Sequence, residues 1–142
     1  MALTQHQQRL DVPTSGRSLV DITVDVQGIV SESGLRLGTV QLLLRHTSAS
    51  LVIQENADPD VKTDLERFFL RLCPDGDPIY DHTMEGPDDM PAHVRCALTS
   101  VHLNIPFDNG RLLLGTWQGI YLWEHRMHPH HRQIVVHVIG ES

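Results

Sequence analysis

The chain has 142 residues, a length typical of one domain with a modest core, and we expect residues 1–142 to form a single domain. Its 18 acidic residues outnumber its 11 Lys and Arg, and the resulting net charge of −7 argues against nucleic acid or a membrane surface as a partner. No run approaches the ~18 apolar residues of a membrane-spanning helix, and the first residues carry no secretory signal, so we expect a cytoplasmic protein.

Cysteine and histidine are the reactive residue types that stand out. Cys73 and Cys96 are too few for a disulfide scaffold, and we expect both to be reduced and packed as small apolar side chains. The ten histidines nearly match Lys and Arg together, and histidine is the commonest metal ligand in proteins. The composition therefore directs attention to metal sites.

The first third of the chain predicts mainly strands. Residues 1–17 are polar and fit either a loose lead-in or a first edge strand. Apolar and polar residues alternate from Ser18 to Gln27, a period of two that is typical of a half-buried strand. A short helix ended by Gly34 comes next, and residues 38–44 form a second, more apolar strand.

The middle of the chain predicts two helices. Asp58 is a typical N-cap, because Pro59 follows it at the first helical position. Apolar residues then recur at helical spacing, and we expect this stripe to face the core: Val61, Leu65, Phe68, Phe69 and Leu72. A second helix is predicted over residues 91–100, with His93 in its first turn.

The last third predicts antiparallel strands in two hairpins. Residues 102–107 and 111–114 flank Asn109-Gly110, a pair typical of a two-residue turn because both central residues take positive φ. Residues 118–126 and 133–139 form a second predicted strand pair, joined across a histidine-containing loop. Strands outnumber helices, so the fold class is α+β, an antiparallel sheet or sandwich with two main helices.

Residues 82–93 hold the most metal-like side chains in the sequence: two imidazoles, one glutamate and two aspartates. Two or three histidines with a carboxylate suit zinc, manganese or iron and leave coordination positions open. The spacing matches no standard metal motif, so the alternative is a polar surface turn with a capped helix start. His46 follows the second predicted strand, where a hydrogen-bonded structural role competes with metal ligation.

Three other groups of residues allow more than one interpretation. The histidines between His125 and His131 lie on a predicted exposed loop, where adventitious metal affinity is favoured over a native site. The aromatic residues between 117 and 123 fit packing in the core or at a subunit interface better than substrate stacking. Glu124 falls on an apolar strand face and needs a partner such as Arg126, a histidine or a metal.

Four segments carry a resemblance to a known family: His46-Thr47-Ser48-Ala49-Ser50, Glu55 to Val61, Glu85 to His93, and Gly115 to Leu122. These segments resemble the signatures of the YjbQ-like family of small bacterial and archaeal proteins, and the similarity runs from about Asp21 to Glu141. The resemblance implies an α+β fold, a homotrimer, and a metal-associated pocket lined by histidine and acidic residues. It also implies a secondary thiamine-phosphate synthase activity, in which a hydroxymethylpyrimidine pyrophosphate alkylates a thiazole phosphate.

The resemblance further implies roles for individual residues. The expected ligands of a divalent ion, such as zinc, manganese or magnesium, are His46, His82 and His93. Residues that would support the ligands or transfer protons are Glu85, Asp88 and Glu124. Contacts with the substrate would come from Thr47, Ser48, Asn56 and Gln118. Because Lys62 is the one lysine, the departing pyrophosphate would depend on the metal, on Arg126 or Arg45, and on backbone N–H groups.

Three functions therefore compete at this point. The first is a divalent-metal-dependent enzyme for a small phosphorylated substrate, a transferase with thiamine-phosphate synthesis as the named candidate. The second is a trimeric protein that binds a metal or a metabolite without catalysis. The third is metal-assisted hydrolysis, which would need Glu85 or Asp88 as the base.

Overall fold

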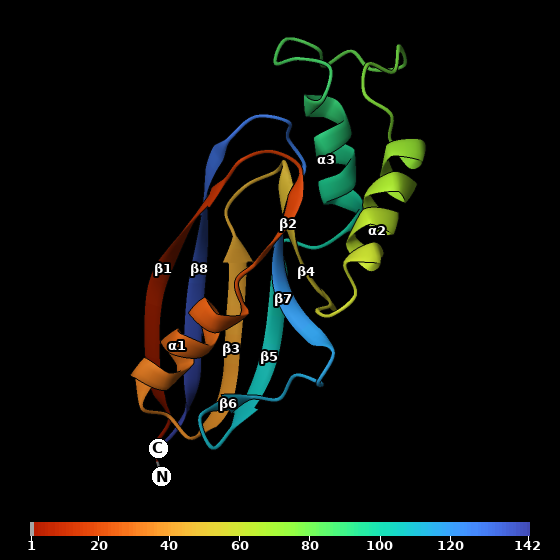
Figure 1. Ribbon diagram of the computed structural model, residues 1–142. Coiled ribbons are helices and arrows are strands. Elements are labelled where there is room, and N and C mark those ends of the chain that lie inside the picture. The colour runs from red at the N-terminus through yellow and green to blue at the C-terminus, as the bar shows by residue number, and fades with distance from the viewer. Residues whose placement is uncertain (1) are drawn as a thin grey trace.

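The computed structural model describes residues 2–142, and within them three helices accompany two antiparallel sheets (Figure 1). The larger sheet, sheet A, has the strand order β1 (Thr4–Thr14), β8 (His130–Glu141), β3 (Leu37–Leu44), β5 (His102–Asp108) and β6 (Arg111–Leu112). The smaller sheet, sheet B, has the order β2 (Ser18–Asp21), β7 (Gln118–Glu124) and β4 (Ala49–Glu55). The helices are α1 (Thr23–Ser33), α2 (Pro59–Leu72) and α3 (Asp89–Leu98). The predicted α+β class is confirmed, and the short helix expected before Gly34 is α1, which has 11 residues.

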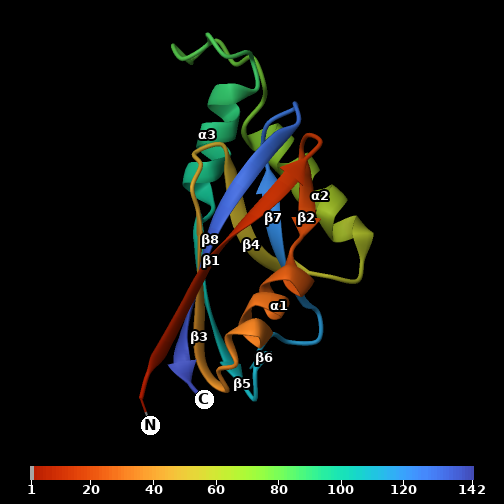
Figure 2. The same cartoon turned by 90° about the vertical axis from the view of Figure 1, so that its left-hand side faces the viewer.

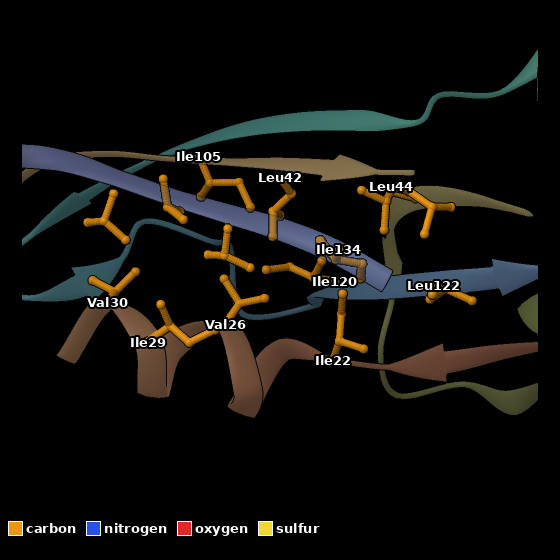
Figure 3. Packing of buried hydrophobic residues seen from close by; sticks show 14 of the residues in the cluster. Ile22, Val26, Ile29, Val30, Leu42, Leu44, Ile105, Ile120, Leu122 and Ile134 are labelled. Atoms are coloured by element: carbon orange, nitrogen blue, oxygen red, sulfur yellow. The ribbon is translucent and has the colours of Figure 1, made fainter. Parts of the chain in front are cut away.

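The hydrophobic core lies between the inner face of sheet A and a second layer made of α1 and sheet B (Figure 3). Successive strand residues point to opposite faces, so every second residue of β8 is buried. The core side chains from the three parts are Leu42, Ile105 and Ile134 of sheet A, Ile120 and Leu122 of sheet B, and Val26, Ile29 and Val30 of α1. No described helix or strand covers the other face of sheet A (Figure 2).

The predicted strand over Ser18–Gln27 is wrong beyond Asp21. The chain turns there, because the Asp21 carboxylate accepts hydrogen bonds from the backbone N–H and the hydroxyl of Thr23, at 2.9 and 2.6 Å. Helix α1 follows, with Val24 exposed and Val26 fully buried. Ile22 and Val26 are four residues apart, so the alternating pattern contained a helical spacing as well as the spacing of a strand. The expected glycine end is confirmed, since Gly34 has φ 71°.

The two last long strands do not form the predicted hairpin with each other. β7 pairs with β2 and β4 in sheet B, whereas β8 pairs with β1 and β3 in sheet A. The connection from Glu124 to His130 therefore crosses from one sheet to the other. The expected hairpin of β5 and β6 is confirmed, with φ of 52° at Asn109 and 72° at Gly110. The first strand is the edge strand that residues 1–17 allowed, because β1 pairs with β8 alone among the described strands.

Helix α2 begins as predicted but does not bury its apolar stripe. The Asp58 side chain accepts a hydrogen bond from the backbone N–H of Asp60 at 2.9 Å. No residue of α2 is fully buried, and Phe68 remains 49% exposed. The helix packs on the outer face of sheet B, where the Phe69 ring meets Trp123 at 5.0 Å. Among the described residues, no helix has the length and apolar character needed to cross a lipid bilayer.

Candidate metal site

The loop that joins α2 to α3 and the first turn of α3 bring three metal-ligating side chains together. His82 comes from the loop, and Asp89 and His93 lie four residues apart on one face of α3. The Nε2 atoms of His82 and His93 lie 2.6 and 3.1 Å from the same carboxylate oxygen, Asp89 Oδ2. One donor atom from each residue lies within 4.8 Å of the other two. Two predicted ligands are thus joined by a carboxylate that the sequence analysis assigned no role.

The hydrogen bond of His93 determines which of its ring nitrogens faces Asp89 as an acceptor. His93 Nδ1 donates to the backbone carbonyl of Thr47 at 2.8 Å, so a neutral His93 carries its proton on Nδ1 and a lone pair on Nε2. That lone pair faces a carboxylate oxygen, and two acceptors at 3.1 Å repel each other unless a proton or a cation lies between them. Two ligands bound to one zinc ion are ~3.3 Å apart, given zinc–ligand bonds of ~2.0 Å and tetrahedral angles. The side chains present therefore fit a divalent cation.

Asp89 is held as a buried anion. Its side chain is almost fully buried, and Arg126 Nη1 donates to its second oxygen, Oδ1, at 2.8 Å. Burial by itself opposes ionisation of Asp89, but the hydrogen bond with His82 and the charge of Arg126 outweigh it and lower its pKa. The carboxylate is therefore charged and ready to bind a cation at neutral pH.

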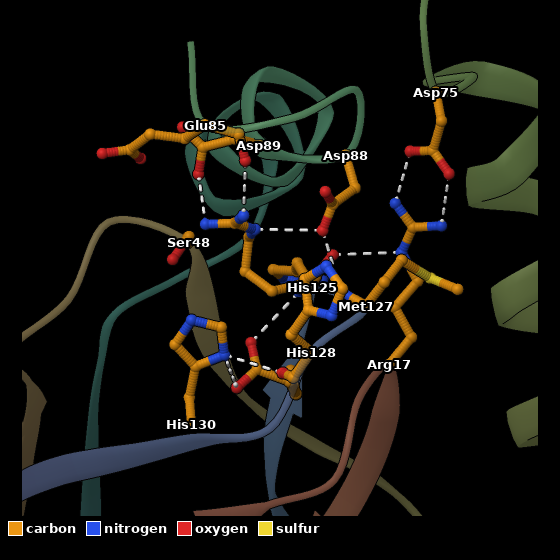
Figure 4. A network of polar contacts seen from close by, with 12 residues as sticks. Arg17, Ser48, Asp75, Glu85, Asp88, Asp89, His125, Met127, His128 and His130 are labelled. Atoms are coloured by element: carbon orange, nitrogen blue, oxygen red, sulfur yellow. Dashed lines mark hydrogen bonds and ion pairs between the residues drawn. The ribbon is translucent and has the colours of Figure 1, made fainter. Parts of the chain in front are cut away.

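Arg126 organises the acidic side of the site instead of facing a substrate. Besides Asp89, it donates through Nε to Asp88 Oδ2 at 3.0 Å and through Nη2 to the Glu85 carbonyl at 3.0 Å. Figure 4 shows the carboxylates of Asp88 and Asp89 turned toward one guanidinium. These bonds use three of the five N–H groups of the guanidinium and hold the side chain against the two aspartates, so a substrate contact of Arg126 would have to use one of the two other N–H groups.

Two of the three predicted proton-transfer residues are locked in ion pairs. Asp88 is buried, and the N–H of Met127 also donates to it at 2.8 Å. Burial by itself raises the pKa of Asp88, but the hydrogen bonds from this N–H and from Arg126 have the larger effect, so the pKa is lowered overall. Glu124 is fully buried, and Glu85 alone of the three exposes its side chain to solvent. The geometry thus makes Asp88 and Glu124 anions that stabilise the structure, whereas Glu85 is exposed to solvent.

The partner of Glu124 is Arg132, a residue that the sequence analysis did not single out. Arg132 donates to Oε1 of Glu124 at 2.8 Å and to Oε2 at 2.5 Å, and the Thr14 hydroxyl donates to Oε1 at 2.6 Å. Burial opposes ionisation of Glu124, yet these bonds lower its pKa. Arg132 also donates to the Ser48 hydroxyl at 3.0 Å, so this predicted substrate contact is occupied. Arg132 could not be found from the sequence, because it is eight residues away on another sheet.

His46, the third predicted ligand, does not join the other two. Its Nε2 accepts a hydrogen bond from the backbone N–H of Gln133 at 2.9 Å. Burial and the charge of Arg132 lower the pKa of His46, so the ring is neutral and its proton lies on Nδ1. Neither ring nitrogen offers a free lone pair in this arrangement. Its neighbour Thr47 contributes through its backbone carbonyl, which orients His93.

Asn56 and Gln118 lie at the far end of sheet B. The seven residues of β4 separate Asn56 from Ser48, and at ~3.3 Å per residue this places their Cα atoms roughly 25 Å apart. Asn56 Nδ2 donates to the carbonyls of Thr116 and Gln118, at 3.1 and 3.3 Å. Gln118 Oε1 accepts from the N–H of Gly115 at 2.7 Å. Both predicted substrate residues therefore stabilise a loop remote from His82 and His93.

His125 is not on an exposed loop, contrary to expectation. It is fully buried, its Nε2 lies 2.8 Å from the Ser50 hydroxyl, and its ring packs against Trp123 at 5.1 Å. Burial, with the nearby charge of Arg95, lowers the pKa of His125 to about 3. Trp123 and Tyr121 are also buried, as the packing interpretation predicted, whereas Trp117 is 62% exposed. Both cysteines are free thiols, as expected.

A cavity of about 320 Å³ opens beside His82. It is lined by that histidine, by neighbouring loop residues such as Tyr80 and Thr83, and by Met90 of α3. No arginine or lysine lines it. This volume suits a small molecule, but a phosphate group placed there would meet no cationic side chain of the described residues.

Comparison with known proteins identifies relatives over nearly the whole chain. The family model described as UPF0047 protein YjbQ-like matches residues 8–141. A UPF0047 protein of Synechocystis is 55% identical over 96% of this chain and 93% of its own length, and the UPF0047 protein YjbQ of Escherichia coli is 41% identical over 96% and 99%. A solved YbjQ-like protein of unknown function from Sulfolobus solfataricus has a TM-score of 0.90 at 26% identity, covering 99% of this chain and 100% of its own. A solved YjbQ/UPF0047 protein from Clostridium acetobutylicum has a TM-score of 0.84 at 37% identity, covering 92% and 98%. The chain therefore belongs to the YjbQ-like UPF0047 family.

Proposed function

We propose that this protein is a divalent-metal-dependent enzyme that acts on a small phosphorylated substrate, with thiamine-phosphate synthesis as the candidate transferase reaction. The observation that carries the proposal is the approach of His82 and His93 to one oxygen of Asp89. Two imidazoles and one carboxylate favour zinc, manganese or iron, whereas magnesium prefers oxygen ligands.

Each residue of the site has a distinct part in this proposal. His93 presents Nε2 because its Nδ1 is bound by the Thr47 carbonyl, and Asp89 keeps its orientation because Arg126 holds Oδ1. When bound, the metal would neutralise charge that develops on a leaving pyrophosphate. The exposed Glu85 is the carboxylate that remains able to exchange a proton, so it is our candidate acid or base.

Metal analysis of the untagged protein tests the proposal. We expect about one divalent ion per chain in the wild type, loss of the ion in His93→Ala and Asp89→Asn, and retention in a variant with His128, His130 and His131 replaced by alanine. Turnover of hydroxymethylpyrimidine pyrophosphate with thiazole phosphate should disappear together with the ion. Normal turnover in metal-free His93→Ala would refute the proposal.

The second candidate is a trimeric protein that binds a metal or metabolite without catalysis. It is favoured by the ion pairs that occupy Arg126, Asp88 and Glu124, and by the lack of a cation around the cavity beside His82. This function predicts one bound ion per chain, no turnover under any substrate pair, and a mass by light scattering of three times 16.0 kDa. A mass of one chain would contradict the trimer.

A further inference from the structure

The uncovered face of sheet A carries a groove that none of the proposed metal chemistry uses. Its volume is about 460 Å³, within the range of sites for small metabolites. The residues that line it come from four neighbouring strands, and four of the seven are Gln or His: Gln7, Gln41, Leu42, Leu43, His102, Val135 and His137. Figure 2 shows that no helix covers this face of β1, β8 and β3.

Two arginines near this groove share one hydrogen-bond acceptor. Arg45 Nη1 donates to Gln133 Oε1 at 2.5 Å, and Arg9 Nη1 reaches the same oxygen at 3.4 Å. Arg9 pairs in register with Val135, which lines the groove. We call Arg9 and Arg45 the arginine pair.

The arginine pair is not neutralised by the protein. Six other arginines have a carboxylate oxygen within 4.0 Å: Arg17, Arg36, Arg67, Arg95, Arg126 and Arg132. In residues 2–142 neither member of the arginine pair has such a partner, although the chain carries a net charge of −7. Asp11 stands opposite Gln133 in register on the same face, but it forms no ion pair with either guanidinium. Two exposed guanidiniums that share one amide oxygen repel each other, and a bound anion would remove this repulsion.

His46 follows Arg45 directly in the chain and binds the residue that both arginines contact. Its Nε2 accepts a hydrogen bond from the backbone N–H of Gln133, so a neutral His46 carries its proton on Nδ1. Thr47, two residues after Arg45, bonds to His93, so the pair lies close to the candidate metal site along the chain.

We propose that the arginine pair binds the phosphate of a small phosphomonoester, with the uncharged part of that molecule in the groove beside Val135 and His137. A phosphate dianion matches two guanidiniums in charge and offers acceptor oxygens to both. A polyanion such as nucleic acid is disfavoured by the net charge of −7. This site would hold the phosphate of the substrate in the proposed function. Only the statement that the bound phosphomonoester is the substrate rests on that proposed function.

Calorimetric titration with inorganic phosphate and then with glycerol phosphate, in metal-free buffer with EDTA, tests the inference apart from the metal. We expect wild-type binding to weaken about tenfold or more in Arg9→Gln/Arg45→Gln, because charge-assisted hydrogen bonds are lost. The double variant Arg71→Gln/Arg111→Gln makes the same charge change at arginines that also lack an ion pair, and it should bind as the wild type does. Asp11→Asn should bind more tightly, since it removes the carboxylate on the same face.

Three results would overturn the inference. These are absence of phosphate binding by the wild type, equal binding by the arginine-pair variant, and equal weakening in the control variant. Light scattering on the same samples tests whether a second copy of the chain occupies the groove instead. In that case the wild type would bind no phosphate, and the mass of Arg9→Gln/Arg45→Gln would be lower than that of the wild type. Loss of metal binding or turnover with phosphate binding intact would refute the proposed function and leave this inference standing.

Discussion

Asp89 and Glu124 are both buried carboxylates paired with an arginine, and only Asp89 belongs to a candidate site. Glu124 accepts from Arg132, from the Thr14 hydroxyl and from the backbone N–H of Arg126, so each of its contacts brings a proton. Asp89 accepts from Arg126 on one oxygen, but its other oxygen faces two imidazole nitrogens, and His93 already has its proton on the opposite ring atom. Burial with an ion pair is thus a structural arrangement, whereas a carboxylate oxygen that faces the lone pair of His93 fits a bound cation.

Removing the charge of Glu124 should give the largest effect on stability. Glu124→Gln leaves Arg132 buried without its anion, and we expect the free energy of unfolding to fall by about 3–5 kcal/mol. Urea denaturation measures this loss. The control is Asp64→Asn, which removes an exposed partner of Arg67 and should change stability by less than about 0.5 kcal/mol. Equal decreases in the free energy of unfolding of the two variants would contradict the structural role that we assign to Glu124.

His125, which lies directly after Glu124, should make stability depend on pH. Its pKa is about 3 in the folded chain and 6.5 when unfolded, so its contribution is complete above pH 6.5 and is lost as the pH falls toward 3. Between pH 6.5 and 4.5 the free energy of unfolding should drop by about 2–3 kcal/mol. His125→Gln, which can still reach the Ser50 hydroxyl, should flatten this slope. A slope that persists in the variant would assign it to other groups.

Removing the charge of Asp89 should affect binding more than folding. Asp89→Asn keeps an acceptor for Arg126 but loses a metal ligand, and we expect zinc affinity to fall more than about 100-fold. Competition with a chromogenic chelator measures the affinity. In the wild type the affinity should decrease as the pH falls, because protons compete with the metal for both histidines. If Glu124→Gln, corrected for its unfolded fraction, lost as much affinity, the distinction between the two carboxylates would fail.

Removing an exposed carboxylate should have the smallest effect, and it gives a reference for the variants of Glu124 and Asp89. Asp58 caps α2 through one hydrogen bond to the N–H of Asp60. Asp58→Ala should lower the free energy of unfolding by about 1 kcal/mol, since α2 buries no residue fully and its first turn depends on this cap. Thermal unfolding monitored by circular dichroism measures the shift, with Asp60→Ala as a variant in the same turn that leaves the cap in place. A loss close to that of Glu124→Gln would show that burial is not what separates these carboxylates.

The parts of the site that the sequence could predict are those encoded within a few residues. His82 and His93 were predicted as ligands from one short segment, and the spacing of Asp89 and His93 on α3 could have added the carboxylate as a third candidate. Arg132 and the role of Arg126 could not be predicted, because their partners depend on how the segment after Glu124 crosses between the sheets. For the same reason the sequence placed His125 on the surface and Asn56 near the metal.

The sequence by itself determined the local structure: the Asp58 cap, the end of α1 at Gly34, and the turn at Asn109-Gly110. These features depend on backbone conformations and hydrogen bonds among adjacent residues, so their causes are present in the order of the residues. Only the tertiary structure decided that β7 and β8 lie in different sheets and that Arg132 neutralises Glu124. Burial and charge pairing depend on which distant segments meet, and that choice belongs to the packing of the whole core.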